Sequence, residues 1–437
     1  MLAICAFVVS GLTAQEVLQW RLARPMVVPG TPDLFQFDVE VSATNPGTYH
    51  RDLQVYLNYN TAAFGSDISA SGAVTVSKLE LLDNPAYPSA TYSIVNVADN
   101  SSSRIAILTE ADNELTQPGT SAHFIEIPDT YTGLFRIQIE IADPAQLAGI
   151  GFESSLMDGG QYYQDAATTD PVKYAASGVY GQTLMNTSLQ GIELAGLKCY
   201  IEGPYTGGGT MSTSLLSSGY LPLNQPYNPS LPYYGNSSPV WLYAGTESVS
   251  SFPANTVDWV LVQLRDAVDV ASAGSGTIIG TQACLLLDDG SVVNTSGNPV
   301  VIKQAYTNNL FVVIYHRNHL GVISNYSPGL NSDGNYTYDF STAADQAYGG
   351  ANGHKDLGGG IFGMVAADGN GNGLIQNDDE TNAWKVDLGS SGYLAGDFDM
   401  NGLCQNTDET NFWKVNLGGG GQVPAKANQG YQSQIPK

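Results

Sequence analysis

The chain has 437 residues, too many for one hydrophobic core, so two to four domains are expected. Its 49 Gly, 21 Pro and 25 Tyr, with only 13% charged residues, are typical of short strands joined by turns, because Gly and Pro destabilise helix interiors. A net charge of −25 argues against nucleic acid and anionic lipid as partners, since both are negatively charged, and it favours cations.

Residues 1–15, MLAICAFVVSGLTAQ, form an apolar run that ends in small and polar residues. This pattern is typical of a secretory signal peptide, although the usual basic start is missing. It predicts Sec-type export of a bacterial protein to the extracellular space or the cell surface. The run is too short to cross a membrane, and no other segment of the sequence could cross one.

Residues 16–190 show a hydrophobic period of two. Apolar residues alternate with polar ones at Phe35, Phe37, Val39 and Val41, and again at Phe135, Ile137, Ile139 and Ile141. The segments 53–60 and 104–108 repeat the pattern between clusters of turn residues, which predicts an antiparallel β-sandwich. The strand that leads into YLNYNTAAF, at Tyr56–Phe64, resembles an early strand and turn of cohesin and related immunoglobulin-like modules.

A second antiparallel β-sandwich is predicted at 195–345. Apolar strands at 257–264, 284–287 and 311–315 are bounded by turn residues. Cys199, Cys284 and Cys404 are too few for a disulfide framework, so free buried thiols are expected, with a Cys199–Cys284 bond as the alternative. The stretches LKCYIEGPYTGGGTM, VDWVLVQLRD and YHRNHLGV resemble a β-rich module of secreted proteins from Bacteroidetes-type bacteria, for which no activity is implied.

An internal repeat occupies the last part of the chain. DGNGNGLIQNDDETNAWKVDLG starts at Asp368, and DFDMNGLCQNTDETNFWKVNLG starts 29 residues later at Asp397. Each copy opens D-x-[DN]-x-N-G, as a calcium loop of the EF-hand type does, where oxygen ligands converge and Gly allows a sharp turn. The expected ligands, with Leu contributing its backbone carbonyl, are Asp368, Asn370, Asn372, Leu374 and Asp379 in the first loop and Asp397, Asp399, Asn401, Leu403 and Asp408 in the second.

The repeat departs from EF-hands in having Asp at position twelve and Gly-rich or Ser-rich segments where an entering helix would be. In both respects it resembles dockerin. The resemblance implies two Ca²⁺ sites in a module at 360–420, short helices at 380–386 and 409–415, and an apolar contact between Ile375 and Cys404. The alternative is a Gly/Asn/Asp turn repeat without metal. Residues 421–437 are expected to form a flexible tail.

Dockerin also implies partner-reading residues at loop positions ten and eleven and one helical turn beyond. These residues are Asn377, Asp378, Trp384, Lys385, Asn406, Thr407, Trp413 and Lys414. Tryptophan is a common interface anchor, and the alternative is that both Trp side chains close the core of the module. The second loop has three carboxylates and the first has two, so the second should bind calcium more tightly.

Other polar residues carry weaker signals. His316 and His319 are three apart at a strand end, where they should face opposite sides and be structural. Carboxylates with strand-end or turn explanations are Asp258, Asp266, Asp288 and Asp289. No motif for a nucleophile or a catalytic metal is present, so the protein is predicted not to be an enzyme.

The combination predicts a mainly β, secreted, calcium-binding assembly protein. It would dock onto a partner with a cohesin-like domain, and that partner could be another copy of itself, which would give head-to-tail filaments. Two alternatives stay open: a carbohydrate-binding adhesin and a dockerin-tethered glycoside hydrolase. A cleft with two close carboxylates would favour the hydrolase.

Overall fold

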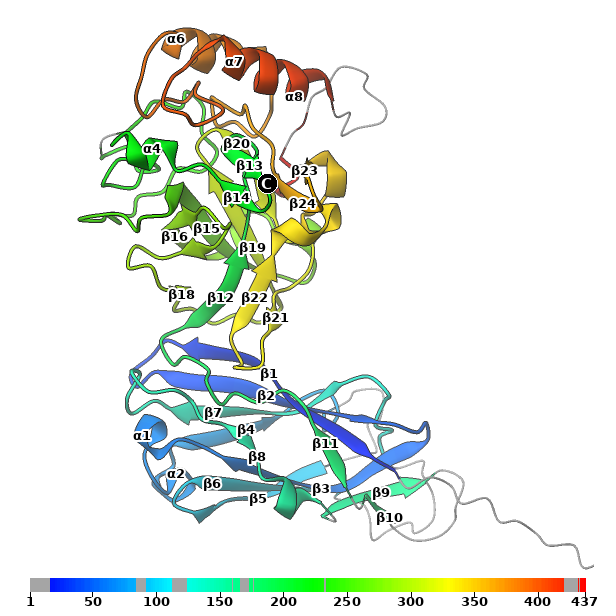
Figure 1. The fold of residues 1–437 in the computed structure, drawn as a ribbon. Helices are drawn as coiled ribbons and strands as arrows, with labels where there is room; N and C mark the ends of the chain where they lie inside the picture. The colour runs from blue at the N-terminus through cyan, green and yellow to red at the C-terminus, as the bar shows by residue number, and fades with distance from the viewer. Residues whose placement is uncertain are drawn as a thin grey trace, which may run out of the picture. The chain divides into compact units, whose positions relative to one another are not determined.

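The computed structural model describes residues 16–83, 92–111, 124–158, 160–165, 173–175, 177–231, 233–419, 431 and 433–437 (Figure 1). The chain folds into two compact units. Unit 1 comprises residues up to 25, 30–189 and 332–334, and unit 2 comprises 26–29, 190–331 and 335–437. The signal predicted at 1–15 lies outside the described residues. Within the described residues, no helix is long and apolar enough to cross a membrane.

Unit 1 contains two β-sheets, which supports the mainly β class predicted from the sequence. One has the order β11-β1-β2-β7-β4 and the other β10-β9-β3-β6-β5, with β8 paired to β3. Its strands are β1 (Leu18–Val28), β2 (Leu34–Ala43), β3 (Thr48–Asn58), β4 (Val74–Lys78), β5 (Tyr92–Ser101), β6 (Arg104–Ala111), β7 (Thr132–Glu140), β8 (Gly151–Phe152), β9 (Gln161–Asp165), β10 (Lys173–Ala175) and β11 (Gly178–Tyr180). Its helical turns are α1 (Thr61–Phe64), α2 (Ile68–Ser71) and α3 (Ser154–Met157).

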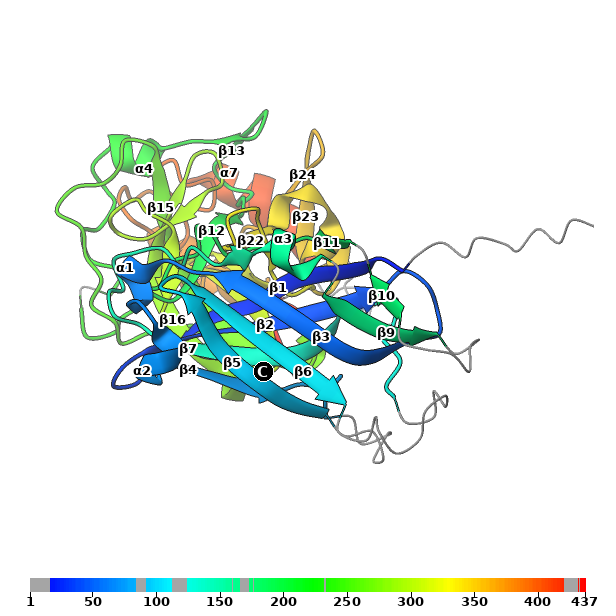
Figure 2. The ribbon, with the colours of Figure 1, turned by 90° about the horizontal axis from the view of Figure 1, so that it is seen from below.

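The core of unit 1 follows the period-two pattern. Side chains that alternate along β2, β3 and β7 are fully buried at Phe35, Phe37, Val39, Val41, Leu53, Val55, Leu57, Phe135, Ile137 and Ile139. Successive side chains of a strand point to opposite faces, so each sheet turns one apolar face inward. Figure 2 views the sheet with β3, β5 and β6 in front of the sheet with β1 and β2. The mainly β class predicted for this part of the chain is confirmed.

Unit 2 pairs a sheet of order β17-β16-β15-β19-β20 with one of order β18-β12-β22-β21. The main strands are β12 (Ile192–Lys198), β15 (Thr256–Ala267), β16 (Ile278–Leu287), β17 (Val292–Val293), β18 (Val300–Ile302), β19 (Asn309–His316), β20 (His319–Ile323), β21 (Gly329–Leu330) and β22 (Tyr336–Asp339). Two hairpins add β13 (Tyr205–Gly207) with β14 (Thr210–Met211) and β23 (His354–Gly358) with β24 (Ile361–Met364). Short helices are α4 (Ser214–Ser217), η3 (Val270–Ser272), η4 (Ser275–Thr277), η5 (Phe340–Thr342), η6 (Ala344–Gln346) and η7 (Gly350–Asn352).

Strand β15 is the centre of unit 2. Val260 and Val262 lie in an apolar cluster with residues of β12 and β22, so this cluster fills the space between the two sheets. Trp259 and Leu261 point the other way, into a second cluster that includes Tyr227 and other residues of the irregular segment 227–249. A strand buried on both faces reads as a continuous apolar run, which is why VDWVLVQL shows no alternation. Cys199, Cys284 and Cys404 are free and buried.

The repeat region belongs to unit 2. Separate domains were predicted at 195–345 and 360–420, but the structure places both in one compact unit. Asp258 of β15 accepts hydrogen bonds from Arg317 Nε (3.0 Å) and Tyr393 OH (2.7 Å), and Asn416 Nδ2 donates to Glu202 Oε2 (2.9 Å). These pairs lie far apart in sequence, so no local pattern in the sequence reveals them.

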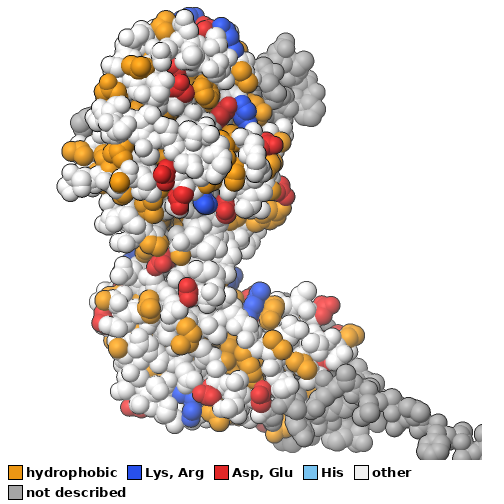
Figure 3. Space-filling view, viewed as in Figure 1, with side chains coloured by type: hydrophobic (Ala, Val, Ile, Leu, Met, Phe, Trp, Pro, Cys, Tyr) orange, Lys and Arg blue, Asp and Glu red, His pale blue; other side chains and the backbone are white. Residues whose placement is uncertain are grey.

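Figure 3 shows acidic side chains spread over the face in view.

The described part of the predicted tail, Tyr431 with Ser433–Lys437, is also held by unit 2. Ser433 N donates to Gly373 O (2.8 Å), and Arg265 Nη1 donates to Pro436 O (2.9 Å). The side chain of Ile435 packs against the second apolar cluster. These residues are therefore docked rather than flexible.

Replacing Asp258 by Ala should selectively destabilise unit 2. The side chains of Asp258 and Arg317 are 0% and 2% exposed, and an Arg left buried without its carboxylate costs about 3–5 kcal/mol. Thermal unfolding of the full chain should show a lower transition for unit 2 and an unchanged one for unit 1. Asp345→Ala, at an exposed position, is the control and should change stability by less than about 0.5 kcal/mol. Equal transitions for Asp258→Ala and wild type would show that the pair does not support unit 2.

Candidate metal centre

The first loop is built around two buried carboxylates, Asp368 and Asp379. Asp379 accepts hydrogen bonds from Asn370 N (3.1 Å) and Gln376 N (2.6 Å), which closes the loop on itself. Asp368 Oδ2 accepts from Gly373 N (3.0 Å), while Asp368 Oδ1 is buried and has no hydrogen-bond partner among the described residues. Gly373, at loop position six, has a φ of +82°, a conformation that favours glycine.

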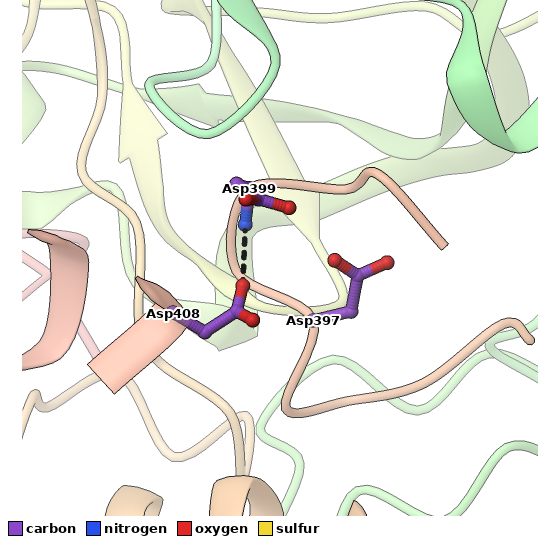
Figure 4. A group of neighbouring side chains, drawn as sticks. All are labelled: Asp397, Asp399 and Asp408. Atoms are coloured by element: carbon purple, nitrogen blue, oxygen red, sulfur yellow. Dashed lines mark hydrogen bonds between the residues drawn. The ribbon is translucent and has the colours of Figure 1, made fainter. Parts of the chain in front are cut away.

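The second loop brings three carboxylates together. One oxygen from each of Asp397, Asp399 and Asp408 lies within 4.8 Å of the others (Figure 4). Asp408 accepts from Phe398 N (2.7 Å), Asp399 N (3.0 Å) and Gln405 N (2.8 Å). Asp397 accepts from Asn401 N (3.1 Å) and Gly402 N (2.8 Å), and the bond from Gly402 matches the bond from Gly373 to Asp368 in the first loop. The sequence repeat is thus a structural repeat.

The asparagines predicted as ligands accept hydrogen bonds from the backbone of their own loops. Asn372 Oδ1 accepts from Leu374 N and Asn401 Oδ1 accepts from Leu403 N, both at 2.8 Å. Asn370 Oδ1 accepts from Asn372 N at 2.9 Å in the same way. Such side-chain-to-backbone bonds tighten a loop while leaving a second lone pair on each amide oxygen. Oxygen donors of this kind suit a hard cation such as Ca²⁺.

A short helical segment follows each loop. The first runs through α5 (Asn377–Asp379), a π-helical turn η8 (Glu380–Trp384) and α6 (Lys385–Asp387), and the second through α7 (Asn406–Asp408), a π-helical turn η9 (Glu409–Trp413) and α8 (Lys414–Gly419). The predicted helices at 380–386 and 409–415 fall inside them. Each segment begins at a Gln in a capping box with the last carboxylate of its loop, so helix and loop share that Asp.

The two copies are joined by their tryptophans. Trp384 Nε1 donates to Gln405 O (2.7 Å), and Trp413 Nε1 donates to Gln376 O (2.8 Å), so each indole binds position nine of the other loop. The side chains are 6% and 7% exposed and lie in one apolar cluster with Ile375 and Cys404. Both Trp residues therefore close the core of the module, which was the alternative to a partner-anchor role.

The remaining residues predicted to read a partner are on the surface. Asn377, Asp378, Lys385, Asn406, Thr407 and Lys414 are all exposed. Ile375 and Cys404 share a cluster, but their backbones pair elsewhere: Ile375 N donates to Tyr431 O and Cys404 N donates to Ser390 O. No backbone hydrogen bond joins the two loops at these positions in the described residues.

Burial dominates the electrostatics of both loops. It raises the pKa of Asp368 well above the usual value, with Asp379 adding to the effect, and it raises the pKa of Asp379 to about 7. Burial likewise raises the pKa of Asp397 to about 8 and that of Asp408 to about 6. Close, buried carboxylates resist ionisation together unless a cation compensates them. With the orphaned Asp368 Oδ1, this donor set fits Ca²⁺.

The other carboxylates have structural partners. Asp266 accepts from Thr307 N and Asn308 N, Asp288 from Asn255 Nδ2, and Asp289 from Ser291 N. Burial acts to raise the pKa of Asp258, but Arg317, His316 and Tyr393 hold it below its usual value. The four serve turns or a buried ion pair.

His316 and His319 were predicted to face opposite sides of a strand, and this prediction is wrong. A two-residue turn, Arg317-Asn318, makes them a cross-strand pair whose Nδ1 atoms are 3.0 Å apart. No role was predicted for the Arg317-Asn318 turn, although it contacts both repeat loops. The one feature of the sequence that could have pointed to it is the polar run HRNH between two apolar strands.

No family model matches the sequence, and no curated protein matches it. Solved structures, among them cohesin modules, are similar to part of the chain. A chain of a type I cohesin–dockerin complex from Clostridium thermocellum is 17% identical, with 38% of this chain and 96% of that chain covered and a TM-score of 0.24. The second type II cohesin of the ScaA scaffoldin of Acetivibrio cellulolyticus is 10% identical (39% and 97% covered, TM-score 0.23). A cohesin module from a family 33 glycoside hydrolase of Clostridium perfringens is 11% identical (38% and 97%, 0.22). At this level of similarity, no activity or partner of those proteins can be assigned to this chain.

If the two loops bind calcium, binding should release protons at low pH and strengthen as pH rises. The ion binds carboxylates, and the raised pKa values of Asp379, Asp397 and Asp408 mean that protons compete with it at pH 6 and no longer at pH 9. Isothermal titration calorimetry at pH 6 should give different apparent binding enthalpies in two buffers of different ionisation enthalpy, because the buffer takes up the released protons. At pH 9 the two buffers should give equal binding enthalpies. Affinity that stays constant from pH 6 to pH 9 would contradict the raised pKa values.

Proposed function

We propose that residues 360–419 bind two calcium ions as a dockerin-like module and that the protein is a secreted assembly component rather than an enzyme. The observation that carries the proposal is the pair of buried carboxylate loops, one with an orphaned Asp368 oxygen and one with three converging carboxylates. Buried acids of this density need a compensating charge, and the loops' oxygen donors suit calcium. The reciprocal Trp–Gln bonds support a single module made of both copies.

We further propose that the exposed side of the two helical segments docks onto a cohesin-like domain of a partner. This surface carries Lys385 and Lys414, whose side chains are 49% and 52% exposed and pair with Glu380 (3.0 Å) and Glu409 (2.9 Å). Exposed ion pairs of this kind contribute little to stability, so the lysines are available to a partner. Basic side chains gather over α6–α8 in Figure 3, on a chain that is otherwise strongly acidic. Val386 and Val415 add apolar surface beside them, at 71% and 49% exposed.

The second loop should bind calcium more tightly than the first, because it has three carboxylates where the first has two. Isothermal titration calorimetry of the full chain should resolve two ions. Asp397→Ala should weaken the stronger site and Asp368→Ala should weaken the other site. Each loss should be at least the roughly 10- to 100-fold that removal of an outer-shell partner costs, since each variant lacks a charged ligand. Asp345→Ala, at an exposed position outside both loops, is the control and should change neither. Wild-type protein that takes up no calcium would refute the module.

Docking should depend on calcium and on the lysines. Light scattering of the full chain mixed with type I and type II cohesin modules should show a complex in calcium and none in chelator. Lys385→Glu with Lys414→Glu should weaken the complex, whereas Lys78→Glu, at an exposed position of unit 1, should not. A mass that grows with concentration for the chain alone in calcium would identify another copy as the partner. A monomer that binds no cohesin module in either condition would contradict the docking role.

A further inference from the structure

The turn between β19 and β20 lies against both calcium loops. This turn, Arg317 and Asn318, is called the hairpin tip. Its two residues are 2% and 0% exposed, although turns usually lie at the surface. A buried polar turn must find partners for its backbone and side chains. The partners here are residues of the two loops.

Asn318 contacts the first ligand residue of both loops. Its backbone carbonyl accepts hydrogen bonds from Ala367 N (3.0 Å) and Asp368 N (3.2 Å). Its side-chain amide Nδ2 donates to Asp397 O (2.8 Å) and, more weakly, to Ala395 O (3.4 Å). Position one of the first loop and position one of the second are thus joined through a single residue.

Arg317 fixes the tip in place. Its guanidinium binds Asp258, lies 4.1 Å from the ring centre of Tyr393, and donates to Leu394 O. Its backbone carbonyl accepts from Asn236 Nδ2 (2.6 Å), and the same amide donates to Gly369 O (2.8 Å) in the first loop. The tip therefore has little freedom to move alone.

Gly203 shows how closely the segment between β12 and β13 approaches the second loop. A Cβ atom at this position would lie 2.0 Å from Phe398 O, and Gly203 N donates to His319 Nε2 (3.0 Å). Only glycine fits between His319 and the residue after Asp397. The second loop is therefore supported from two sides, by Gly203 and by Asn318.

We propose that Asn318 is a positioning residue that couples the two calcium sites, so that an ion in one loop favours binding in the other. This inference rests on the proposed calcium module. Because the tip is held rigidly, a shift of Asp368 on binding an ion is passed through Asn318 to Asp397, so an ion in one loop also helps to align the first ligand of the other loop. The coupling acts in both directions, because linkage between two binding equilibria is reciprocal.

Coupling can be measured by removing one site at a time. Asp408→Asn, which disables the second loop, should weaken calcium binding to the first loop by roughly five- to tenfold in otherwise wild-type protein. In an Asn318→Ala background, Asp408→Asn should leave the first loop unchanged, because the amide that reaches Asp397 is gone. Asn382→Ala, an exposed Asn of the helical segment after the first loop, is the matched control and should preserve the coupling.

The outcomes separate the two proposals. Wild-type protein that binds no calcium would refute the module itself. Two ions that bind independently in wild type, or a coupling that survives in Asn318→Ala, would overturn the role of Asn318 alone. Calcium binding to the first loop of Asn318→Ala reports that the variant is folded. If that variant does not fold, Asn318→Ser, which keeps a hydroxyl donor, should show reduced coupling, and full coupling would overturn the proposal.

Discussion

The ion pair of Asp258 and Arg317 is the interaction on which unit 2 depends. Taking two charges out of water costs several kcal/mol for each, and only additional hydrogen bonds offset that cost. Asp258 has them from Tyr393, from His316 and from the backbone of Trp259. The pair orients Arg317 and with it the turn that meets both loops. Strand β15 and the two repeat loops are therefore linked within one compact unit.

Asp258 and Asp368 are buried carboxylates whose charges are compensated differently. Both are buried carboxylates, and burial disfavours the charge of each. Asp258 has a guanidinium within the protein, so its pKa is held down. Asp368 accepts a hydrogen bond from Gly373 N on one oxygen, and its other oxygen has no hydrogen-bond partner among the described residues. The charge of the first carboxylate is compensated within the protein, whereas no cationic side chain in the described part of the chain is recorded on the second.

Local patterns in the sequence predicted the local features of the structure. The period of two along Phe35 to Val41 predicted a strand with one apolar face, although Gln36 and Asp38 on its other face are buried as well. The ligand spacing of the repeat predicted loops closed by Asp379 and Asp408. The position of Trp384 could not be predicted in this way, because its partner, Gln405, belongs to the other copy. The contact of Asn318 with Asp368 and Asp397 was equally out of reach, since it joins residues 50 and 79 positions apart. Hydrophobic period and turn chemistry carry no information about such pairs.

The close approach of Gly203 to Phe398 bears on how the repeat could be inherited. A self-contained cassette can be moved between genes by recombination at its flanking linker. Here a cut between β22 and β23 would leave Gly203, Asn236 and Asn318 behind and expose the carbonyls and amides that they satisfy. Transplanting residues 360–419 onto a foreign protein should therefore yield loops without their supports. Shuffling of this repeat during evolution would have to carry the preceding β-domain along with it.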